Sequence, residues 1–349
     1  MSQKTNTAAP AKRSAYAAAG VNIDSKMSGI RAIKDMVAQT ATPGVAAGIG
    51  GFGGLFEAPG RDSLLVASTD GVGTKLKVAV MARRHNTVGQ CLVNHCVNDI
   101  LVQGAQPLFF MDYIGASNFN AEVFKEIVSG LCKACKENGC ALLGGETAEL
   151  PGLYPQGEYD LVGTIVGCVP KRRLIDGRKV KPGDAIIGLP SYGLQTNGYS
   201  LARKVIFDQC GLTCNDSIPG TRGTVADHLL AVHRSFLKPV NDVMAKVDIH
   251  GMAHITGGGF PDNIPRVLPD ACDAVINRAS WVPGTLFTFI QQQGKVDRDE
   301  MYRVFNMGLG YLLIVDAKDV DKTMKILEPH RPVLCGKIVK GGRKVTYEN

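Results

Sequence analysis

The chain lacks the features of a secreted or membrane-spanning protein. No apolar run reaches the ~18 residues that a membrane-spanning helix needs. The first fifteen residues, MSQKTNTAAPAKRSA, lack the apolar core of a signal peptide, and we expect residues 1–15 to form a disordered tail. Without a secretory signal, the ten cysteines are expected to be reduced thiols. The sequence therefore predicts a cytoplasmic protein with no membrane partner.

Several common functional motifs are also missing. No G-x-x-x-x-G-K-[ST] motif is present, which excludes a P-loop enzyme. Cys132-x-x-Cys135 has no second C-x-x-C with which to complete a zinc site, and the apolar periodicity around it is typical of a helix, so core packing is the favoured interpretation. The 39 basic and 32 acidic residues are spread along the chain without a basic block. We therefore expect no nucleic-acid partner, whereas an anionic small substrate suits the charge.

Glycine, in contrast, is abundant. The 41 glycines cluster in short loops, which favours loops that approach a ligand closely. Gly48, Gly50 and Gly53 form a literal G-x-G-x-x-G, but no strand precedes it and Pro59 interrupts the segment after it, which argues against a dinucleotide-binding fold. Two interpretations of this loop stay open. It either folds over phosphates with its backbone N–H groups or is a mobile surface loop.

Strands and helices mix in both halves of the chain without regular βαβ alternation. We therefore predict an α+β protein with two mixed α/β-sheet domains. The polar, turn-rich segment PKRRLIDGRKVKPGD marks the boundary, which gives an N-terminal domain over 16–170 and a C-terminal domain over 171–349. The predicted elements include helices over 27–38, 123–138, 198–210 and 261–268, a strand over 64–68 and a closing strand over 332–339.

Acidic residues stand at the ends of several predicted elements. Asp70 follows a strand, Asp99 lies late in a helix, and Glu146 and Glu149 lie in GGETAELPG. Taken singly, each fits a helix cap, a turn or a solvated side chain. Taken together, they suit an oxygen-ligand site for Mg²⁺, with Lys75 contacting nucleotide phosphates from the other side. The residue pattern alone leaves both interpretations open.

Two glycine turns in the second half allow the same choice. Asn197 precedes Gly198 and a predicted helix, so Asn197 is either an N-cap or a ligand-binding residue. Thr256 and three glycines precede the helix predicted over 261–268. That turn is either a tight structural turn or a receptor for a phosphate monoester.

Longer motifs resolve these choices by resemblance. GGFGGLF, STDGVGTKLKVA, GCALLGGETAELPGLYPQGEYDLVGTIVGCV, TNGYSLARK and AHITGGGFPDNIPRVLP occur in order between about Tyr16 and the C-terminus. In these motifs the chain resembles the phosphoribosylformylglycinamidine cyclo-ligase (aminoimidazole ribonucleotide synthetase) family of purine biosynthesis. The resemblance implies ATP-dependent ring closure of formylglycinamidine ribonucleotide to aminoimidazole ribonucleotide, with ADP and phosphate, through an iminophosphate.

The resemblance also implies an assembly and a site. The family forms homodimers in which strands of two first domains close a shared barrel, with active sites in clefts near the interface. It implies ATP and Mg²⁺ as cofactors, and it makes Asp70, Lys75 and Asp99 the catalytic residues. The metal ligands would be Asp70, Asp99 and Glu146. The nucleotide would contact Lys34, Gly51, Gly53, Gly54, Asp70, Gly71, Lys75, Asn98, Asp99 and Glu146; the substrate would contact Asn197, Thr256, Gly257, Gly258 and Gly259.

The chain departs from the family pattern at two positions. Asn22 stands where the family usually has an acid, and Gln195 stands where it usually has a histidine. Glutamine forms hydrogen bonds but transfers no proton near neutral pH, so we interpret this position as substrate-binding and assign no general base. The alternatives are a related kinase or selenophosphate synthetase, the latter disfavoured because the first ninety residues lack cysteine, and a non-catalytic nucleotide-binding scaffold.

Overall fold

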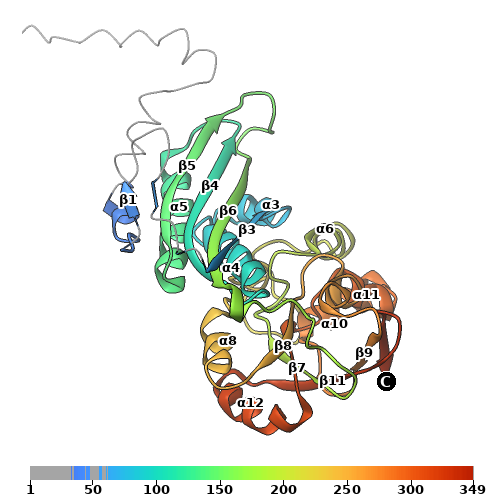
Figure 1. Cartoon of the computed structure of the whole chain (residues 1–349). Coiled ribbons are helices and arrows are strands. Elements are labelled where there is room, and N and C mark those ends of the chain that lie inside the picture. The colour runs from blue at the N-terminus through green and yellow to red at the C-terminus, as the bar shows by residue number, and fades with distance from the viewer. Residues whose placement is uncertain are drawn as a thin grey trace, which may run out of the picture.

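The computed structural model describes Ile33 and residues 35–43, 45–47, 55–56, 60 and 62–348. Within these ranges the chain forms two lobes, each built on its own sheet (Figure 1). The predicted class, two mixed α/β-sheet domains, is confirmed. A short antiparallel pair, β1 (Val45–Ala47) and β2 (Leu55–Phe56), precedes them. Most of the helix predicted over 27–38 lies outside the described residues.

The first lobe contains a four-stranded sheet in the order β3-β6-β4-β5. Strands β4 and β5 are parallel, and the other neighbours are antiparallel. Buried and half-buried residues alternate along β6, because one face of the sheet packs against helices while the other is more open. The strands are β3 (Ser63–Gly71), β4 (Gln106–Ala116), β5 (Ala141–Glu149) and β6 (Tyr159–Pro170).

Helix α4 (Val88–Leu101) is the central helix of this lobe and is buried along almost its whole length. It contacts β3 and β6 on one side and α5 (Ala121–Asn138) on another (Figure 1). In α5, Asn120 caps the N-terminus and Gly139 ends the helix in the left-handed conformation. Cys132 and Cys135 are buried in the core, as the periodicity predicts. A shorter helix, α3 (Lys75–Ala82), follows β3.

The second lobe contains a six-stranded sheet in the order β12-β9-β11-β7-β10-β8. Neighbours are antiparallel except β12 and β9, and β10 is buried at every residue. The strands are β7 (Ala185–Pro190), β8 (Ile249–His254), β9 (Cys272–Asn277), β10 (Leu309–Val315), β11 (Val333–Lys340) and β12 (Val345–Glu348). The helices are α6 (Tyr199–Arg203), α7 (Val225–Leu229), α8 (Leu237–Met244), α9 (Gly259–Asn263), α10 (Thr285–Gly294), α11 (Arg298–Val304) and α12 (Val320–Leu327).

Some predicted elements differ from those observed. Strand β3 continues through Gly71, since its polar end pairs with β6. The helix predicted over 198–210 divides into α6 and a π-helical segment, Lys204–Gln209. The helix predicted over 261–268 is the five-residue α9 followed by a 3₁₀ segment, Ile264–Val267, because Pro265 cannot donate a hydrogen bond within an α-helix. The chain does not close with β11: β12 follows it and pairs with β9.

Among the described residues, no helix is long and apolar enough to cross a membrane. All ten cysteines lie in the described part of the chain, and each is a free thiol.

Helices α4 and α5 cross at two glycines, which gives a test of the packing. A Cβ atom on Gly89 would lie 2.7 Å from the backbone N of Leu131 and closer still to the carbonyl of Ile127. We expect Gly89→Ala to destabilise the protein by about 1–3 kcal/mol through overpacking. Gly342→Ala, where a Cβ meets nothing within 4 Å, is the control and should stay within about 0.5 kcal/mol. Urea unfolding measures both, and equal stabilities would contradict the packing argument.

Candidate active site

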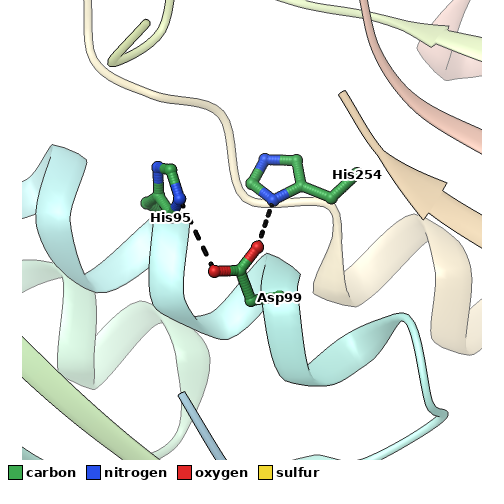
Figure 2. Close-up of side chains that lie close together, drawn as sticks. All are labelled: His95, Asp99 and His254. Atoms are coloured by element: carbon green, nitrogen blue, oxygen red, sulfur yellow. Dashed lines mark hydrogen bonds and ion pairs between the residues drawn. The ribbon is translucent and has the colours of Figure 1, made fainter. Parts of the chain in front are cut away.

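A cluster of acids and histidines lies where the two lobes meet. His95 and Asp99 lie one turn apart on α4, and Asp99 stands between His95 and His254 at the end of β8 (Figure 2). The Nε2 atom of His95 is 2.7 Å from Oδ2 of Asp70 and 3.5 Å from Oδ2 of Asp99. The Nδ1 atom of His254 is 2.8 Å from Oδ1 of Asp99. Three separate elements, β3, α4 and β8, therefore converge on the two carboxylates.

Local structure explains this convergence. Residues four apart on a helix share one face, which aims His95 and Asp99 in the same direction. Ser68 and Asp70 alternate with the outward-facing Thr69 along β3, so both turn toward α4. Ser68 donates a hydrogen bond to Oδ2 of Asp99 (3.2 Å), and the Gly71 N–H donates to Oδ1 of Asp70 (2.6 Å).

Two further residues close the cluster into a ring. The hydroxyl of Thr196 lies 2.6 Å from Nδ1 of His95 and 3.3 Å from Nδ1 of His233. The Nε2 atom of His233 lies 3.1 Å from Nε2 of His254. We call this set the histidine–aspartate ring; its members, in order of contact, are Asp70, His95, Thr196, His233, His254 and Asp99.

One assignment of protons satisfies every contact of the ring. His95 carries both ring protons and donates to Asp70 and to the Thr196 hydroxyl. That hydroxyl donates to His233, which donates through Nε2 to His254, and His254 donates through Nδ1 to Asp99. His95 is then an imidazolium between two carboxylates, and the other two imidazoles are neutral.

The pKa shifts agree with this assignment. Burial lowers the pKa of His95, but the hydrogen bond to Asp70 and the two carboxylate charges outweigh burial and raise it. Burial raises the pKa of Asp70 and Asp99, yet their histidine partners hold both below the usual range. Burial, followed by the charges of its histidine neighbours, lowers the pKa of His233 well below its ordinary value. The carboxylates are therefore ionised at neutral pH.

The ring borders a cavity of about 690 Å³ between the lobes. The Asp70 and Asp99 side chains remain 41% and 27% exposed, so both carboxylates face solvent in this cavity. The cavity is lined by Ser68, Asp70, Asp99, Asn197, His254, Thr256, Gly257 and Arg266, among others. A separate cavity of about 780 Å³, lined by residues 170–179 and 244–250, contains none of the predicted site residues.

The glycine turn after β8 forms one wall of the site. Asn263 donates from Nδ2 to the carbonyls of Thr256, Gly257 and Gly259, which fixes the turn. Gly259 has φ +57° and a Cβ there would overlap the carbonyl of Tyr302, so glycine is required at this position. Because α9 has only five residues, the turn itself, and not a long helix dipole, would have to bind a phosphate.

Comparisons with known proteins identify the family. Models of the AIR synthase related protein match residues 53–169 with the N-terminal domain and residues 181–348 with the C-terminal domain. The phosphoribosylformylglycinamidine cyclo-ligase of Thermoanaerobacter sp. is 48% identical over 328 residues, which cover 93% of this chain and 97% of that protein. This chain belongs to the AIR synthase related protein family. The enzyme of the same name from Alkaliphilus metalliredigens is 44% identical, with 95% of this chain and 96% of that protein covered.

Solved structures of other proteins have the same fold. Thiamine-monophosphate kinase from Stenotrophomonas maltophilia superposes with a TM-score of 0.68 at 16% identity and covers 91% of this chain and 96% of its own. Hydrogenase maturation protein HypE in complex with ATP superposes with a TM-score of 0.66 at 17% identity and covers 91% and 90%. At such low identity the likeness concerns the fold alone.

The structure brings together only part of the site expected from the AIR synthase resemblance. Asp70, Asp99, Asn197, Thr256 and Gly257 line the same cavity. Gly258 lines the adjoining cavity of about 940 Å³ together with Gly257. Asn197 is not an N-cap, because Gly198 holds that position and no side chain caps α6. Lys34, Gly51, Gly53, Gly54 and the departure at Asn22 lie outside the described residues.

Two predicted nucleotide contacts have structural partners instead. Lys75 is fully buried, and its Nζ donates to the carbonyls of Gln195 (2.9 Å) and Ala231 (2.7 Å), so it does not reach the cavity. Asn98 is also fully buried; its amide donates to the Arg234 carbonyl and accepts from the Phe236 N–H. In this structure their polar atoms pair with backbone groups of the second lobe, and nucleotide contact by Lys75 and Asn98 remains a prediction.

Glu146 and Gln195 also differ from expectation. Asp70 on β3 pairs with Gly163 on β6. Gly163 pairs in turn with Asp112 on β4, and Asp112 pairs with Gly145 on β5. Three strand spacings of ~4.8 Å therefore put Glu146 about 14 Å from Asp70. Glu146 therefore does not meet Asp70 and Asp99 within one chain, and its role as a metal ligand remains a prediction. Gln195 is buried with φ +62°, and it does not line the cavity.

Sequence reasoning missed the three histidines and Thr196. One signal was available, since His95 lies four residues before Asp99 in NHCVND. His233 lies in a loop outside the quoted motifs, and His254 lies in AHITGGGFPDNIPRVLP, but no local pattern pairs either residue with Asp99.

The ring predicts a pH dependence of stability. The raised pKa of His95 means that its contribution is fully present below the unfolded value of ~6.5 and is lost as pH rises through the folded value. The lowered pKa values of Asp70 and Asp99 mean that their contributions are lost as pH falls below ~4. We expect metal-free wild-type protein to lose more stability between pH 6.5 and 9 than His95→Gln, measured by urea unfolding. Parallel pH profiles would contradict the imidazolium assignment.

Proposed function

We propose that this chain is an ATP-dependent phosphoribosylformylglycinamidine cyclo-ligase. It would convert formylglycinamidine ribonucleotide and ATP to aminoimidazole ribonucleotide, ADP and phosphate in purine biosynthesis. The observation that carries the proposal is the 48% identity to an enzyme of that name over 97% of that enzyme's length. The two carboxylates in an interlobe cavity provide the local chemistry. The ten free thiols support a cytoplasmic location.

The reaction places two requirements on the active site. The formyl oxygen is a poor leaving group, so ATP phosphorylates it to give an iminophosphate. The other nitrogen of the substrate then attacks the same carbon, and phosphate leaves as the ring closes. The protein must neutralise charge at the transferred phosphoryl group and align the two reacting atoms.

Asp70 and Asp99 are suited to hold Mg²⁺ beside the ATP phosphates. Their carboxylates are ionised and exposed to the cavity, and Ser68 fixes one oxygen of Asp99. Mg²⁺ prefers carboxylate and phosphate oxygens together with water, so the cavity-facing donors fit this ion. When bound, the ion would supply charge neutralisation at the phosphates. The resemblance also assigns Lys34, Gly51, Gly53 and Gly54 to the nucleotide; these residues lie outside the described part of the chain.

The opposite wall would hold the substrate. Asn197 and Thr256 project polar groups beside Gly257, and a Cβ on Gly257 would lie 3.2 Å from Oδ1 of Asn197. The absence of that Cβ lets the backbone of Gly257 and Gly258 approach a ligand closely. The turn is rigid because Asn263 binds three of its carbonyls, and rigidity favours alignment of the substrate.

We also propose a homodimer formed through the open face of the first sheet. Leu65 (61% exposed) and Met111 (38% exposed) lie on this face, and Thr69 and Thr164 hydrogen bond between them. Two such faces packed together would form the expected barrel and bury these side chains. Glu146 lies on the edge strand β5, so a partner chain is the route by which it would reach a site containing Asp70.

The activity is tested by ADP release from the pure full-length chain with Mg-ATP, with and without formylglycinamidine ribonucleotide. We expect release to depend on this substrate and to fall by at least about 100-fold in Asp70→Asn, since a ligand at the phosphoryl group is lost. Asp321→Asn, an exposed acid on α12, is the matched control and should keep wild-type turnover. Release that ignores the substrate would refute the assignment, and nucleotide binding without any release would favour a scaffold protein.

The shared site is tested by complementation between two inactive variants. If Glu146 acts with Asp70 of a partner, mixing Asp70→Asn with Glu146→Gln chains gives hybrid dimers with one intact site. Random reassortment would then restore on the order of a quarter of wild-type activity. Each variant alone should stay inactive, and sedimentation should show dimers in every sample. Dimers that exchange chains without any recovery would contradict a shared site.

A further inference from the structure

The histidine–aspartate ring holds nitrogen donors for which Mg²⁺ chemistry gives no role. Magnesium takes oxygen ligands, whereas imidazole nitrogen suits zinc, cobalt and similar ions. His95 Nε2, His254 Nδ1 and a carboxylate oxygen of Asp99 lie within 4.8 Å of one another. The imidazoles of His95 and His254 are almost fully buried, so the surrounding packing holds them in position. Oxygen ligands alone would not require this arrangement.

We propose that His95, His254 and Asp99 form a binding site for a divalent transition-metal ion of the zinc or cobalt class, with Asp70 as the fourth ligand. Two histidines and one or two carboxylates are a common donor set for these ions. Bonds of 2.0–2.1 Å in a tetrahedron separate the ligand atoms by about 3.3 Å. The contacts of 2.7 and 2.8 Å that now join these histidines to carboxylates would thus open by about half an ångström.

The remainder of the ring can orient both histidines for an ion. With the ion bound, His95 keeps its Nδ1 proton on the Thr196 hydroxyl, and His254 moves its proton to Nε2 and donates to His233. His233 then donates through Nδ1 to the Thr196 hydroxyl oxygen, which also accepts from Nδ2 of Asn197 3.4 Å away. Each metal-bound imidazole thus donates its other N–H to a fixed acceptor, as in known metal sites.

This site is distinct from the Mg²⁺ position and does not depend on the proposed activity. His95 contacts Asp70 and Asp99 without lining the cavity, whereas His254 contacts Asp99 at the cavity wall. Each carboxylate has two oxygens with about four lone pairs, so the two acids can serve a nitrogen-bound ion and an oxygen-bound ion together.

Titration of metal-free, untagged, full-length protein with Co²⁺ in the absence of nucleotide tests the proposal. We expect one ion per chain, a visible d–d absorption typical of four- or five-coordination, and displacement by Zn²⁺ but not by millimolar Mg²⁺. His254→Gln and His95→Gln should abolish the band. Thr196→Val should weaken binding by about 10–100-fold, because it removes the acceptor that orients His95. His228→Gln, a histidine beside a different cavity, should bind as wild type.

Each alternative outcome overturns the proposal. Unchanged binding in both histidine variants would assign the ion to another part of the chain. Displacement by equimolar Mg²⁺ would reduce the site to an oxygen-ligand site. Absence of any stoichiometric binding by wild-type protein would leave the ring with a purely structural role. Circular dichroism and thermal unfolding of each variant distinguish loss of a metal-ligating side chain from loss of the fold. Two histidine variants are used so that the test still stands if one of them does not fold.

Discussion

A buried lysine joins the two lobes at the point where the site is assembled. Lys75 has no exposed surface, and its ammonium donates to two backbone carbonyls of the second lobe and lies 5.4 Å from the ring centre of Tyr199. Burying an unpaired charge costs several kcal/mol, so these contacts must be made well for the fold to hold. Gln195 and Ala231, which supply the carbonyls, lie next to Thr196 and near His233. The lysine therefore fixes the two segments that complete the histidine–aspartate ring.

Helix α4 repeats this arrangement with neutral groups. The amides of Asn94 and Asn98 bind backbone atoms of the 233–236 segment, and both lie on the helix that carries His95 and Asp99. One helix thus both holds the second lobe and contributes to the ring. Because the lobes are held by buried, paired polar groups, relative movement would leave several of these groups unpaired, each at about 1–3 kcal/mol. The geometry of the cavity is accordingly set by the same contacts that set the fold.

These contacts between the lobes also limit prediction from the sequence. Asp70 could be found because a long motif surrounds it, and Asp99 because it lies late in a predicted helix. The two-domain class follows from the mixture of strands and helices. Lys75 carries the same motif signal, yet its burial depends on carbonyls more than a hundred residues away. No local sequence pattern predicts a contact between residues so far apart in the chain. The distance from Glu146 to Asp70 likewise depends on the strand order and register and not on the motif around Glu146. The contact between His233 and His254 could not be predicted from the sequence, because only the tertiary fold brings them together.

The position of His95 explains how two carboxylates can share a small, partly buried space. Like charges a few ångströms apart repel by several kcal/mol at the effective dielectric of a protein surface, and one acid would ordinarily take up a proton to relieve this. A cation between them removes the repulsion, and in this structure the imidazolium of His95 supplies it. Both carboxylate pKa values are lowered despite burial for the same reason. Because Asp70 and Asp99 are stabilised by a positive charge between them, the space between these carboxylates is suited to bind a cation.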